Sequence, residues 1–311
     1  MSASSLSVVV GLISGRKSDV RRCLNALHSQ TIDGLAEILV PYDDPCADVA
    51  TLKAEFPRVR FLHAAGLDTA EARAGASREH HDTLRTIGLR AATRDVIALT
   101  EDHAVVAQTW CEEMIAALAR HGNAAAVGGA VECESDRRLN HAVWFCDFGR
   151  YQQELPEGPA AFVSDSNVAY RRAALDRVAS AWQDDYHETA VHWAMMAAGY
   201  ELCTTPRVEV RQARGALSLG EALRERYVWA RSFAGTRARM IGPKRFVLGI
   251  LAPLLPFVMT WRLAATTARR GRHMSQFLRC LPLILLLQTV WAFGEFVGYI
   301  TADPGGRAES R

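Results

Sequence analysis

The chain has 311 residues, which is enough for one large domain or for one domain of ordinary size with an appendage. Apolar residues make up 49% of the chain and charged residues 23%, so the composition predicts a sizeable core and excludes a disordered protein. The formal net charge is only +2, which gives no whole-chain signal for nucleic acid, and we expect no nucleic-acid partner.

The first part of the chain predicts strands that alternate with helices. Runs of valine, isoleucine and leucine indicate buried strands, and apolar residues at helical spacing indicate helices between them. The predicted strands cover 6–12, 36–42 and 59–63, and the predicted helices cover 19–30 and 48–56. This alternation predicts a parallel sheet with helices on its faces.

The same pattern continues after an Ala/Gly-rich stretch at 64–77, which we interpret as a loop or a weak helix. A strand at 95–100 is followed at once by Glu101, Asp102 and His103. The remaining predicted helices cover 81–93, 110–121, 187–198 and a segment that begins near Arg171, and the remaining extended segments cover 125–132, 162–169 and 201–210. We therefore expect an α/β unit over residues 1–215.

Acidic residues follow two of the predicted strands. Asp43 and Asp44 end one strand, and Glu101 and Asp102 end another. In open parallel sheets, ligands bind at the carboxyl ends of strands, so both acidic pairs could face one ligand. Oxygen ligands of this kind suit Mg²⁺ or Mn²⁺, the cations that accompany a nucleoside diphosphate. The alternative is that these carboxylates cap the next helix or face water.

Two other positions carry candidate chemistry. Arg85 lies on the helix before the 95–100 strand, where a guanidinium could contact a base or a phosphate, or could be an ordinary surface charge. Glu188 stands at the start of the helix that ends before Gly199, where a carboxylate keeps its charge and could act as a base. Capping of this helix is the alternative, and it fits Asp184 and Asp185 better than Glu188.

Taken in order, these segments resemble family 2 glycosyltransferases from about Leu6 to Arg239. The matching stretches are SVVVGLISGRKSDVRRCLNALHSQ, EILVPYDDPCAD, LRTIGLRAATRDVIALTEDH, SDSNVAYRRAAL, HETAVHWAMMAAGYEL and RERYVWARSFAG. The resemblance implies a GT-A fold, which is a Rossmann-like, mostly parallel sheet flanked by helices. It also implies a nucleotide-sugar donor, a divalent cation and an inverting displacement.

The resemblance also implies roles for individual residues. Glu188 would be the catalytic base, and Asp102 would be the metal ligand. The donor would be bound by Ser14, Asp43, Asp44, Arg85, Glu101, Asn167, Arg171, Arg226 and Arg231.

Several positions depart from the family pattern. The DxD motif is here Thr100-Glu101-Asp102, the acidic pair is His187-Glu188, and RVEVRQ lacks the histidine that often completes the metal site, with Arg211 or Gln212 in its place. A catalytically degenerate nucleotide-sugar-binding or scaffolding relative is therefore the main alternative. A nucleotidyltransferase is a further one, but the segment from Gly11 to Lys17 lacks the ending of a phosphate-binding P-loop.

The last part of the chain, 216–311, predicts a basic amphipathic helix at 219–239 and two apolar helices. Residues 246–261 and 280–294 contain no charge, and both runs are short for a membrane-spanning helix. Arginines and lysines flank and separate them, so the tail either lies in the cytoplasmic interface as a surface segment or hairpin, or spans twice against the charge rule. Burial of both helices in a soluble core is the remaining alternative.

The seven cysteines are odd in number, and none are spaced as CxxC. Scattered thiols indicate a reducing compartment, and the N-terminus carries no signal-peptide pattern. We therefore expect a transferase at the cytoplasmic side of the cell membrane. Its expected partners are the nucleotide-sugar, a lipid or glycan acceptor and the membrane surface.

Overall fold

The computed structural model describes residues 5–30, 35–67 and 78–305. Its contacts divide the chain into two compact units. Apart from an excursion at Ser135–Arg150, the first unit holds most of the chain up to Arg214, and the second unit holds that excursion and the chain from Gly215 onward.

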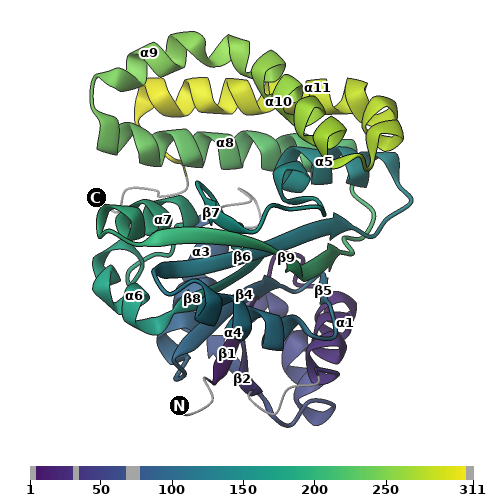
Figure 1. Cartoon of the computed structure of the whole chain (residues 1–311), viewed down its shortest axis with the longest axis vertical. Coiled ribbons are helices and arrows are strands. Elements are labelled where there is room, and N and C mark those ends of the chain that lie inside the picture. The colour runs from purple at the N-terminus through teal and green to yellow at the C-terminus, as the bar shows by residue number, and fades with distance from the viewer. Residues whose placement is uncertain (1–4, 31–34, 68–77, 306–311) are drawn as a thin grey trace. The chain divides into compact units, whose positions relative to one another are not determined.

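The first unit is built on one mixed sheet, which has nine strands within the described residues (Figure 1). Its main path runs in the order β3-β2-β1-β4-β8-β6-β9-β5, and β7 pairs with β9. The strands are β1 (Leu6–Gly11), β2 (Leu35–Asp43), β3 (Val59–Ala64), β4 (Val96–Glu101), β5 (Ala104–Val106), β6 (Ala124–Cys133), β7 (Gly158–Ala160), β8 (Asn167–Arg171) and β9 (Glu201–Gln212).

Helices flank this sheet, as the sequence predicted. They are α1 (Lys17–His28), α3 (Arg78–Ala91), α4 (Trp110–Arg120), α6 (Arg172–Arg177) and α7 (Glu188–Ala197), with 3-10 segments η1 (Asp44–Ala54) and η3 (Ala179–Ala181). The predicted α/β fold with a mostly parallel sheet is therefore confirmed in its main part. β1, β2, β3 and β4 are mutually parallel, and β6 is parallel to β9.

Strand β8 runs antiparallel to both of its neighbours, β4 and β6, and the short strands β5 and β7 are likewise antiparallel to β9. The register of β8 with β4 sets Asn167 opposite Thr100 and Arg171 opposite Val96. The two ends of this short strand therefore lie at opposite edges of the sheet, which matters for the site.

Some local predictions differ from the structure. The helix expected at 48–56 is a 3-10 segment that begins earlier, where Asp43 caps it through a hydrogen bond from the Cys46 amide. The helix expected at 19–30 begins earlier, at Lys17, and ends at His28. Strands β5 and β7 and helix α5 (Arg138–Phe148) are too short or too weakly periodic to be predicted from sequence.

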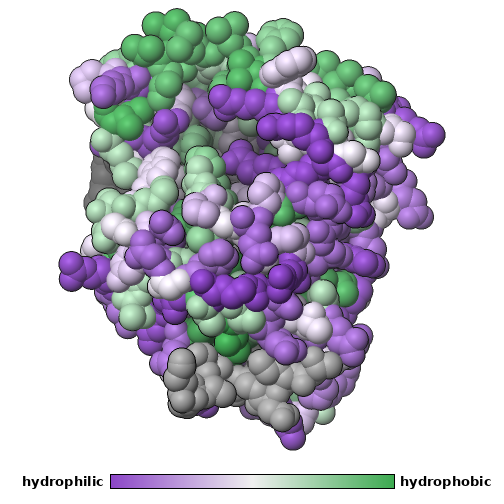
Figure 2. Space-filling model, in the orientation of Figure 1, coloured by the Kyte–Doolittle hydropathy of each residue, from purple (hydrophilic) through white to green (hydrophobic). Residues whose placement is uncertain are grey.

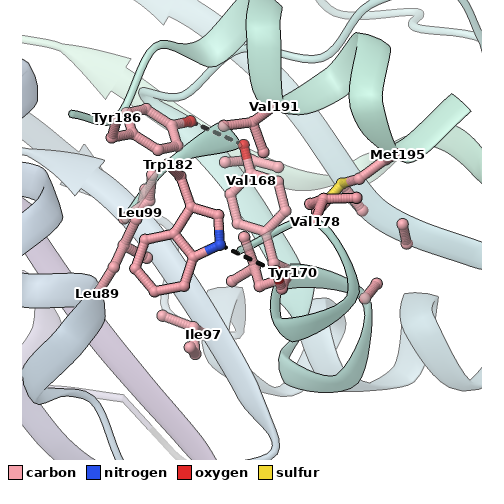
Figure 3. Close-up of a cluster of buried hydrophobic side chains, with 14 of the residues drawn as sticks. Leu89, Ile97, Leu99, Val168, Tyr170, Val178, Trp182, Tyr186, Val191 and Met195 are labelled. Atoms are coloured by element: carbon pink, nitrogen blue, oxygen red, sulfur yellow. Dashed lines mark hydrogen bonds between the residues drawn. The ribbon is translucent and has the colours of Figure 1, made fainter. Parts of the chain in front are cut away.

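The core beside β4 and β8 contains large aromatic side chains (Figure 3). Tyr170 of β8 and Tyr186 are fully buried, and their hydroxyl groups hydrogen-bond at 2.8 Å. Trp182 donates its indole N–H to the Leu175 carbonyl at 2.9 Å. These bonds anchor the segment that leads into α7, because a buried hydroxyl or indole N–H must find a partner.

The second unit is a helical layer. After α5 and the 3-10 segment η2 (Gly149–Tyr151) it contains α8 (Leu219–Ile241), α9 (Lys244–Leu251), η4 (Ala252–Leu254), α10 (Leu255–Arg270) and α11 (Met274–Thr301). Within it α11 packs closely on α8, since a Cβ on Gly294 would lie 2.6 Å from the Tyr227 carbonyl oxygen and one on Gly298 2.6 Å from that of Arg231. The expected apolar appendage is therefore present. Among the described residues, Lys244–Arg270 and Met274–Thr301 are long and apolar enough to cross a membrane.

Candidate functional site

The candidate site lies at one edge of the parallel half of the sheet, where β1, β2 and β4 end. Gly11 at the end of β1 pairs with Glu101 at the end of β4, and the Asp102 amide donates to the Gly11 carbonyl at 2.9 Å. Carboxyl ends of parallel strands meet at the same edge, which is where α/β sheets bind their ligands.

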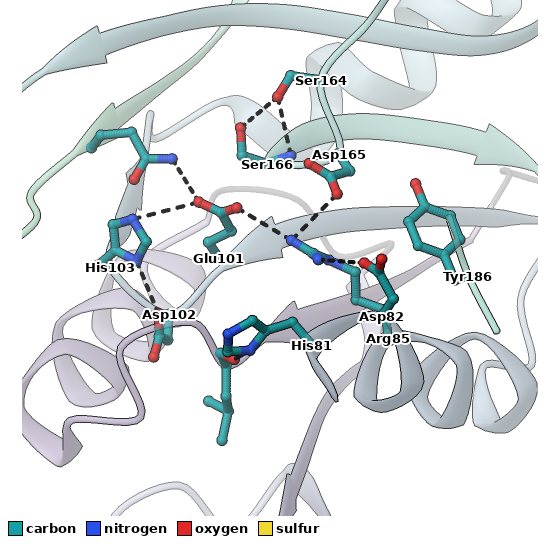
Figure 4. Close-up of polar contacts among 12 residues, drawn as sticks. His81, Asp82, Arg85, Glu101, Asp102, His103, Ser164, Asp165, Ser166 and Tyr186 are labelled. Carbon is teal, nitrogen blue, oxygen red and sulfur yellow. Dashed lines mark hydrogen bonds and ion pairs between the residues drawn. The ribbon is translucent and has the colours of Figure 1, made fainter. Parts of the chain in front are cut away.

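Arg85 is the centre of a buried ionic network at this edge (Figure 4). Its guanidinium contacts three carboxylates: Asp82 at 3.1 Å, Glu101 at 3.2 Å and Asp165 at 3.4 Å. Burial opposes the positive charge, but the carboxylates outweigh it and raise the pKa of Arg85 above its ordinary value. Arg85 is therefore a fixed cation of the edge and not a surface charge.

Helix α3 delivers Arg85 to this position because Gly88 allows it to approach the sheet. A Cβ on Gly88 would lie 2.3 Å from Val9 Cγ1 and 3.0 Å from Pro41 Cγ, so a larger residue would push the helix away. Gly88 and Arg85 are three residues apart and share the same helix face. The glycine thus sets the depth at which the guanidinium reaches the strand ends.

Asp102 holds the loop after β1. Its carboxylate accepts hydrogen bonds from the Ser14 amide at 3.0 Å, the Ser14 hydroxyl at 2.9 Å and the Gly15 amide at 2.8 Å. His103 Nδ1 lies 3.0 Å from its other oxygen. Burial opposes the charge of this carboxylate, yet these hydrogen bonds and the His103 charge lower the pKa of Asp102.

Glu101 is held on the other side of His103. Its carboxylate contacts Arg85, accepts a hydrogen bond from Gln212 Nε2 at 2.9 Å and lies 3.5 Å from His103 Nε2. Gln212 stands where the family pattern commonly has a metal-binding histidine. Its side chain donates a hydrogen bond to Glu101 instead.

Asp43 and Asp44 end β2 near the same loop. A Cβ on Gly15 would lie 2.6 Å from Cys46 Sγ, so the loop that Asp102 holds touches the segment that Asp43 caps. Asp44 is exposed, with His63 Nε2 at 2.6 Å and the Gly66 amide at 3.1 Å from its oxygens. The hydrogen bond from Gly66, followed by that from His63, lowers the pKa of Asp44.

Glu188 is half-buried at the first position of α7. The segment before it is fixed on α3, because the Tyr186 amide donates to Thr86 Oγ1 at 2.8 Å. Burial raises the pKa of Tyr186 well above its ordinary value, and the charges of Asp165 and Glu188 add to this effect. The charge of Glu188 therefore acts on Tyr186, the buried residue two positions before it.

Asn167 and Arg171 have structural partners. Asn167 is fully buried, donates to the Ala130 carbonyl at 2.8 Å and accepts from Trp110 Nε1 at 2.8 Å. Arg171 lies at the far end of β8, where its guanidinium donates to the Ala124 carbonyl at 2.8 Å. The antiparallel direction of β8 is why Arg171 is not brought to the edge that carries Glu101.

Arg226 and Arg231 belong to the second unit. Arg226 is buried, pairs with Asp147 and lies 4.2 Å from the ring of Trp291. Arg231 pairs with Asp303. Both guanidinium groups therefore have partners within their own unit.

The arrangement at this edge does not fit a divalent cation. Asp102, the predicted ligand, is fully buried and already accepts from two backbone amides and a hydroxyl, and Glu101 is occupied by Arg85 and Gln212. Within residues 5–30, 35–67 and 78–305, no group of three or more histidine, cysteine, aspartate or glutamate side chains is arranged to hold a metal. A cation would require Asp102 to release the Ser14–Gly15 loop.

Three residues of this edge were not singled out as site residues from sequence: Asp82, Asp165 and Tyr186. His103 was noted in the polar cluster after the 95–100 strand but was given no role. Asp82 stands three residues before Arg85 on a predicted helix, which is a spacing that pairs opposite charges. Asp165 lies in the same SDSN stretch as Asn167. The pairing of Asp82 with Arg85 could have been predicted from this spacing, whereas the pairing of Asp165 with Arg85 depends on the sheet topology.

The sequence model of the family "Glycosyl transferase family 2" matches residues 14–179. Among solved structures, the chain is similar to mannosyltransferase PcManGT from Pyrobaculum calidifontis in complex with GDP-Man and Mn²⁺. The TM-score is 0.50 and the identity 16%, over 96% of this chain and 85% of that one. No curated protein sequence matches this chain.

Proposed function

The chain belongs to glycosyl transferase family 2 and has its GT-A fold, and from this premise we propose an inverting transfer of a sugar from a nucleotide-sugar donor to a lipid or glycan acceptor. One observation carries the proposal. The ends of β1, β2 and β4 meet at one edge, and α3 and the segment before α7 bring Arg85 and the Glu188 region toward it.

In this proposal the exposed carboxylate of Asp44 and the buried carboxylate of Asp43 contact the nucleoside part of the donor. Ser14 and Gly15 present the loop after β1, which Asp102 holds in place. Arg85 keeps Glu101 and Asp165 oriented at the strand ends, so the donor meets a preorganised polar edge. Asn167, Arg171, Arg226 and Arg231, which the family resemblance assigned to the donor, are assigned here to the framework because of their contacts.

Glu188 is proposed as the base. The acceptor hydroxyl attacks the anomeric carbon, the bond from that carbon to the diphosphate breaks, and the hydroxyl proton passes to the Glu188 carboxylate. Its place at the N-terminus of α7 favours the charged form that this step needs.

A Mg²⁺ or Mn²⁺ ion stays a prediction. The similar mannosyltransferase is a complex with GDP-Man and Mn²⁺, but here Asp102 would have to exchange its contacts with Ser14 and Gly15 for the ion. The same observation supports the second candidate function, which is a relative that binds the nucleotide-sugar without turning it over.

Thermal-shift titration against a panel of UDP- and GDP-sugars, with and without Mn²⁺, identifies the donor, and transfer is then measured with that donor. Glu188→Gln should reduce transfer by about a hundredfold or more while donor binding persists. Asp184→Asn is the matched control, since Asp184 is an exposed carboxylate of the same segment. Full transfer by Glu188→Gln contradicts its role as base, and donor binding without turnover in the unaltered protein favours the binding-only relative.

We also propose that the protein works at the cytoplasmic side of a membrane and that its acceptor is presented there. The support is the pair of apolar helices in the second unit. Fractionation of cells into soluble and membrane pools tests the membrane association, and protease treatment of intact and lysed cells tests the side.

A further inference from the structure

The outer face of α9, η4 and α10 carries a continuous apolar stripe, formed by Phe246, Val247, Ile250, Leu254, Phe257 and Trp261. The spacing of these residues follows one side of a helix. Ile250 is 73% exposed, Phe257 70% and Trp261 74%. Figure 2 shows hydrophobic side chains gathered over α9 and α10.

This concentration is specific to one part of the chain. Among the described residues, eight of the large exposed hydrophobic side chains fall between Phe246 and Trp261, whereas only Phe162 and Met196 belong to the first unit. Soluble surfaces rarely expose apolar side chains in one contiguous patch, and such patches mark sites of interaction.

The opposite face of the same helices is already used. Gly249 lies against α11, where a Cβ would come within 3.1 Å of Ile300 Cδ1. Pro256, Thr260, Leu263 and Thr267 of α10 are buried. The helices are therefore held by their inner face, and the apolar stripe is the face left for a partner.

Charge identifies that partner. Between Glu225 and Glu295 the sequence contains eleven lysines and arginines and no aspartate or glutamate. Lys244, Arg262, Arg269 and Arg272 are exposed beside the stripe or at the ends of its helices. Arg262 follows Trp261 directly, about 100° around the helix, so the charge lies at the border of the stripe. An apolar stripe with a cationic border matches an anionic lipid surface.

We infer that the apolar stripe inserts into one leaflet of an anionic bilayer, with α9 and α10 lying in the membrane plane, and that the tail does not cross the membrane. This inference deepens the membrane association proposed above and names the face that makes it. It chooses the surface arrangement over a two-span hairpin.

The packing of α11 argues against crossing. Gly294 and Gly298 bring its backbone against α8, and polar contacts join the two helices: Arg226 to Gln288 at 3.4 Å and Arg237 to the Tyr299 hydroxyl at 3.1 Å. If α11 crossed the bilayer, α8 would have to enter with it. Arginines within a bilayer are costly, and α8 carries Arg224, Arg226, Arg231, Arg237 and Arg239.

The first test is flotation of the full chain with vesicles of pure phosphatidylcholine and with vesicles that also contain phosphatidylglycerol. The double variant Phe257→Glu/Trp261→Glu should lower binding to the anionic vesicles by about tenfold or more. Arg269→Gln should weaken it by about fivefold and only on anionic vesicles. The matched control is Phe162→Glu, an exposed aromatic residue of the first unit, which should bind as the unaltered protein does.

Unchanged flotation of the double variant overturns the inference. So does a stable dimer of the lipid-free protein that the double variant abolishes, because a second copy would then be the partner of the stripe. Donor-induced thermal shift, measured on every variant, checks that the variant is folded. Flotation needs no donor, so its result tests this inference separately from the proposed function.

The second test concerns topology. A protease recognition sequence inserted after Gly271, in the turn between α10 and α11, should be cut equally by protease outside sealed vesicles and by protease added after the vesicles are lysed. Cutting only after lysis would place the turn in the lumen, and the tail would then span the bilayer.

Discussion

Two acidic pairs follow buried strands in this chain, and the fold treats them in opposite ways. Glu101 and Asp102 are buried and contact Arg85, His103, Gln212 and the Ser14–Gly15 loop. At the other pair Asp43 caps η1, and Asp44 is exposed beside the edge with His63 and Gly66 as partners. The same sequence pattern, an acidic pair after a buried strand, thus produces one pair in which both members are buried and one pair with an exposed member.

The difference arises from what covers each strand end. Strand β4 is central, so α3, the 164–166 turn and β9 all reach its end and supply partners. Strand β2 lies one strand from the margin of the sheet, and among the described residues its end is flanked by β3, by the start of η1 and by the loop after β1, whose Gly15 lies against Cys46. The comparison teaches that a carboxylate after a strand is buried where several elements converge on the strand end and can stay exposed where fewer do.

Replacement of Arg85, the positive charge at the centre of the buried ionic network, should have the largest effect on stability. Arg85→Met removes the positive charge that Arg85 brings to the buried carboxylates of Asp82, Glu101 and Asp165, and we expect a loss of about 3–5 kcal/mol in the free energy of unfolding. Urea denaturation measures it. Arg90→Met on the exposed side of α3 is the control and should leave the free energy of unfolding nearly unchanged. Equal losses in the two variants would contradict the special role of the buried ion pairs of Arg85.

The second-largest effect on stability is expected from acid, through protonation of the buried side chain of His192. Burial lowers the pKa of His192 from its ordinary value of 6.5 to about 4, where its Nε2 lies 2.7 Å from the Tyr170 hydroxyl. The folded state therefore binds fewer protons than the unfolded state between these two pH values. The contribution of neutral His192 to stability is fully present above about pH 6.5. The free energy of unfolding then falls by up to about 3 kcal/mol as the pH drops to about 4.

The variant His192→Gln sharpens this prediction, because glutamine keeps a polar partner for Tyr170 but does not titrate. Unfolding curves recorded from pH 7 to pH 4 should be flatter for the variant than for the unaltered protein. Parallel curves would mean that another group is responsible for the loss in acid.

A smaller loss is expected from Asp102→Asn. An amide nitrogen facing the Ser14 and Gly15 amides leaves one buried donor without an acceptor, at a cost of about 2 kcal/mol. Asp95→Asn, an exposed carboxylate just before the other end of β4, is the control. If Asp102 is mainly a metal ligand, the substitution should instead abolish Mn²⁺-dependent donor binding and leave the melting temperature almost unchanged.

The smallest effect on stability is expected from Asp44→Asn. Its side chain is exposed, so the melting temperature should stay unchanged, whereas affinity for the donor nucleotide should fall about tenfold through loss of a charged hydrogen bond. Calorimetric titration with the nucleoside diphosphate measures this, with Asp48→Asn as the exposed control on η1. Unaltered affinity would remove Asp44 from the proposed site.

Much of the alternation of strands and helices could be predicted because it depends on local periodicity. The runs at 6–12, 95–100 and 125–132 became β1, β4 and β6 within one or two residues. The direction of β8 could not be predicted, because an apolar run of a few residues does not encode its partner. That direction sets Asn167 opposite Thr100 near the end of β4 and Arg171 opposite Val96 at its start.

The sequence by itself determined the alternating α/β pattern, the acids after β2 and β4, and the apolar, arginine-rich tail, since each follows from composition and spacing along a short stretch of chain. Only the tertiary structure decided which acids are buried, that Asp165 and Asp82 share Arg85, and which face of α9 and α10 stays exposed. The physical reason is that burial and ion pairing depend on neighbours that are far away in sequence, and the sheet order and helix packing bring those neighbours together.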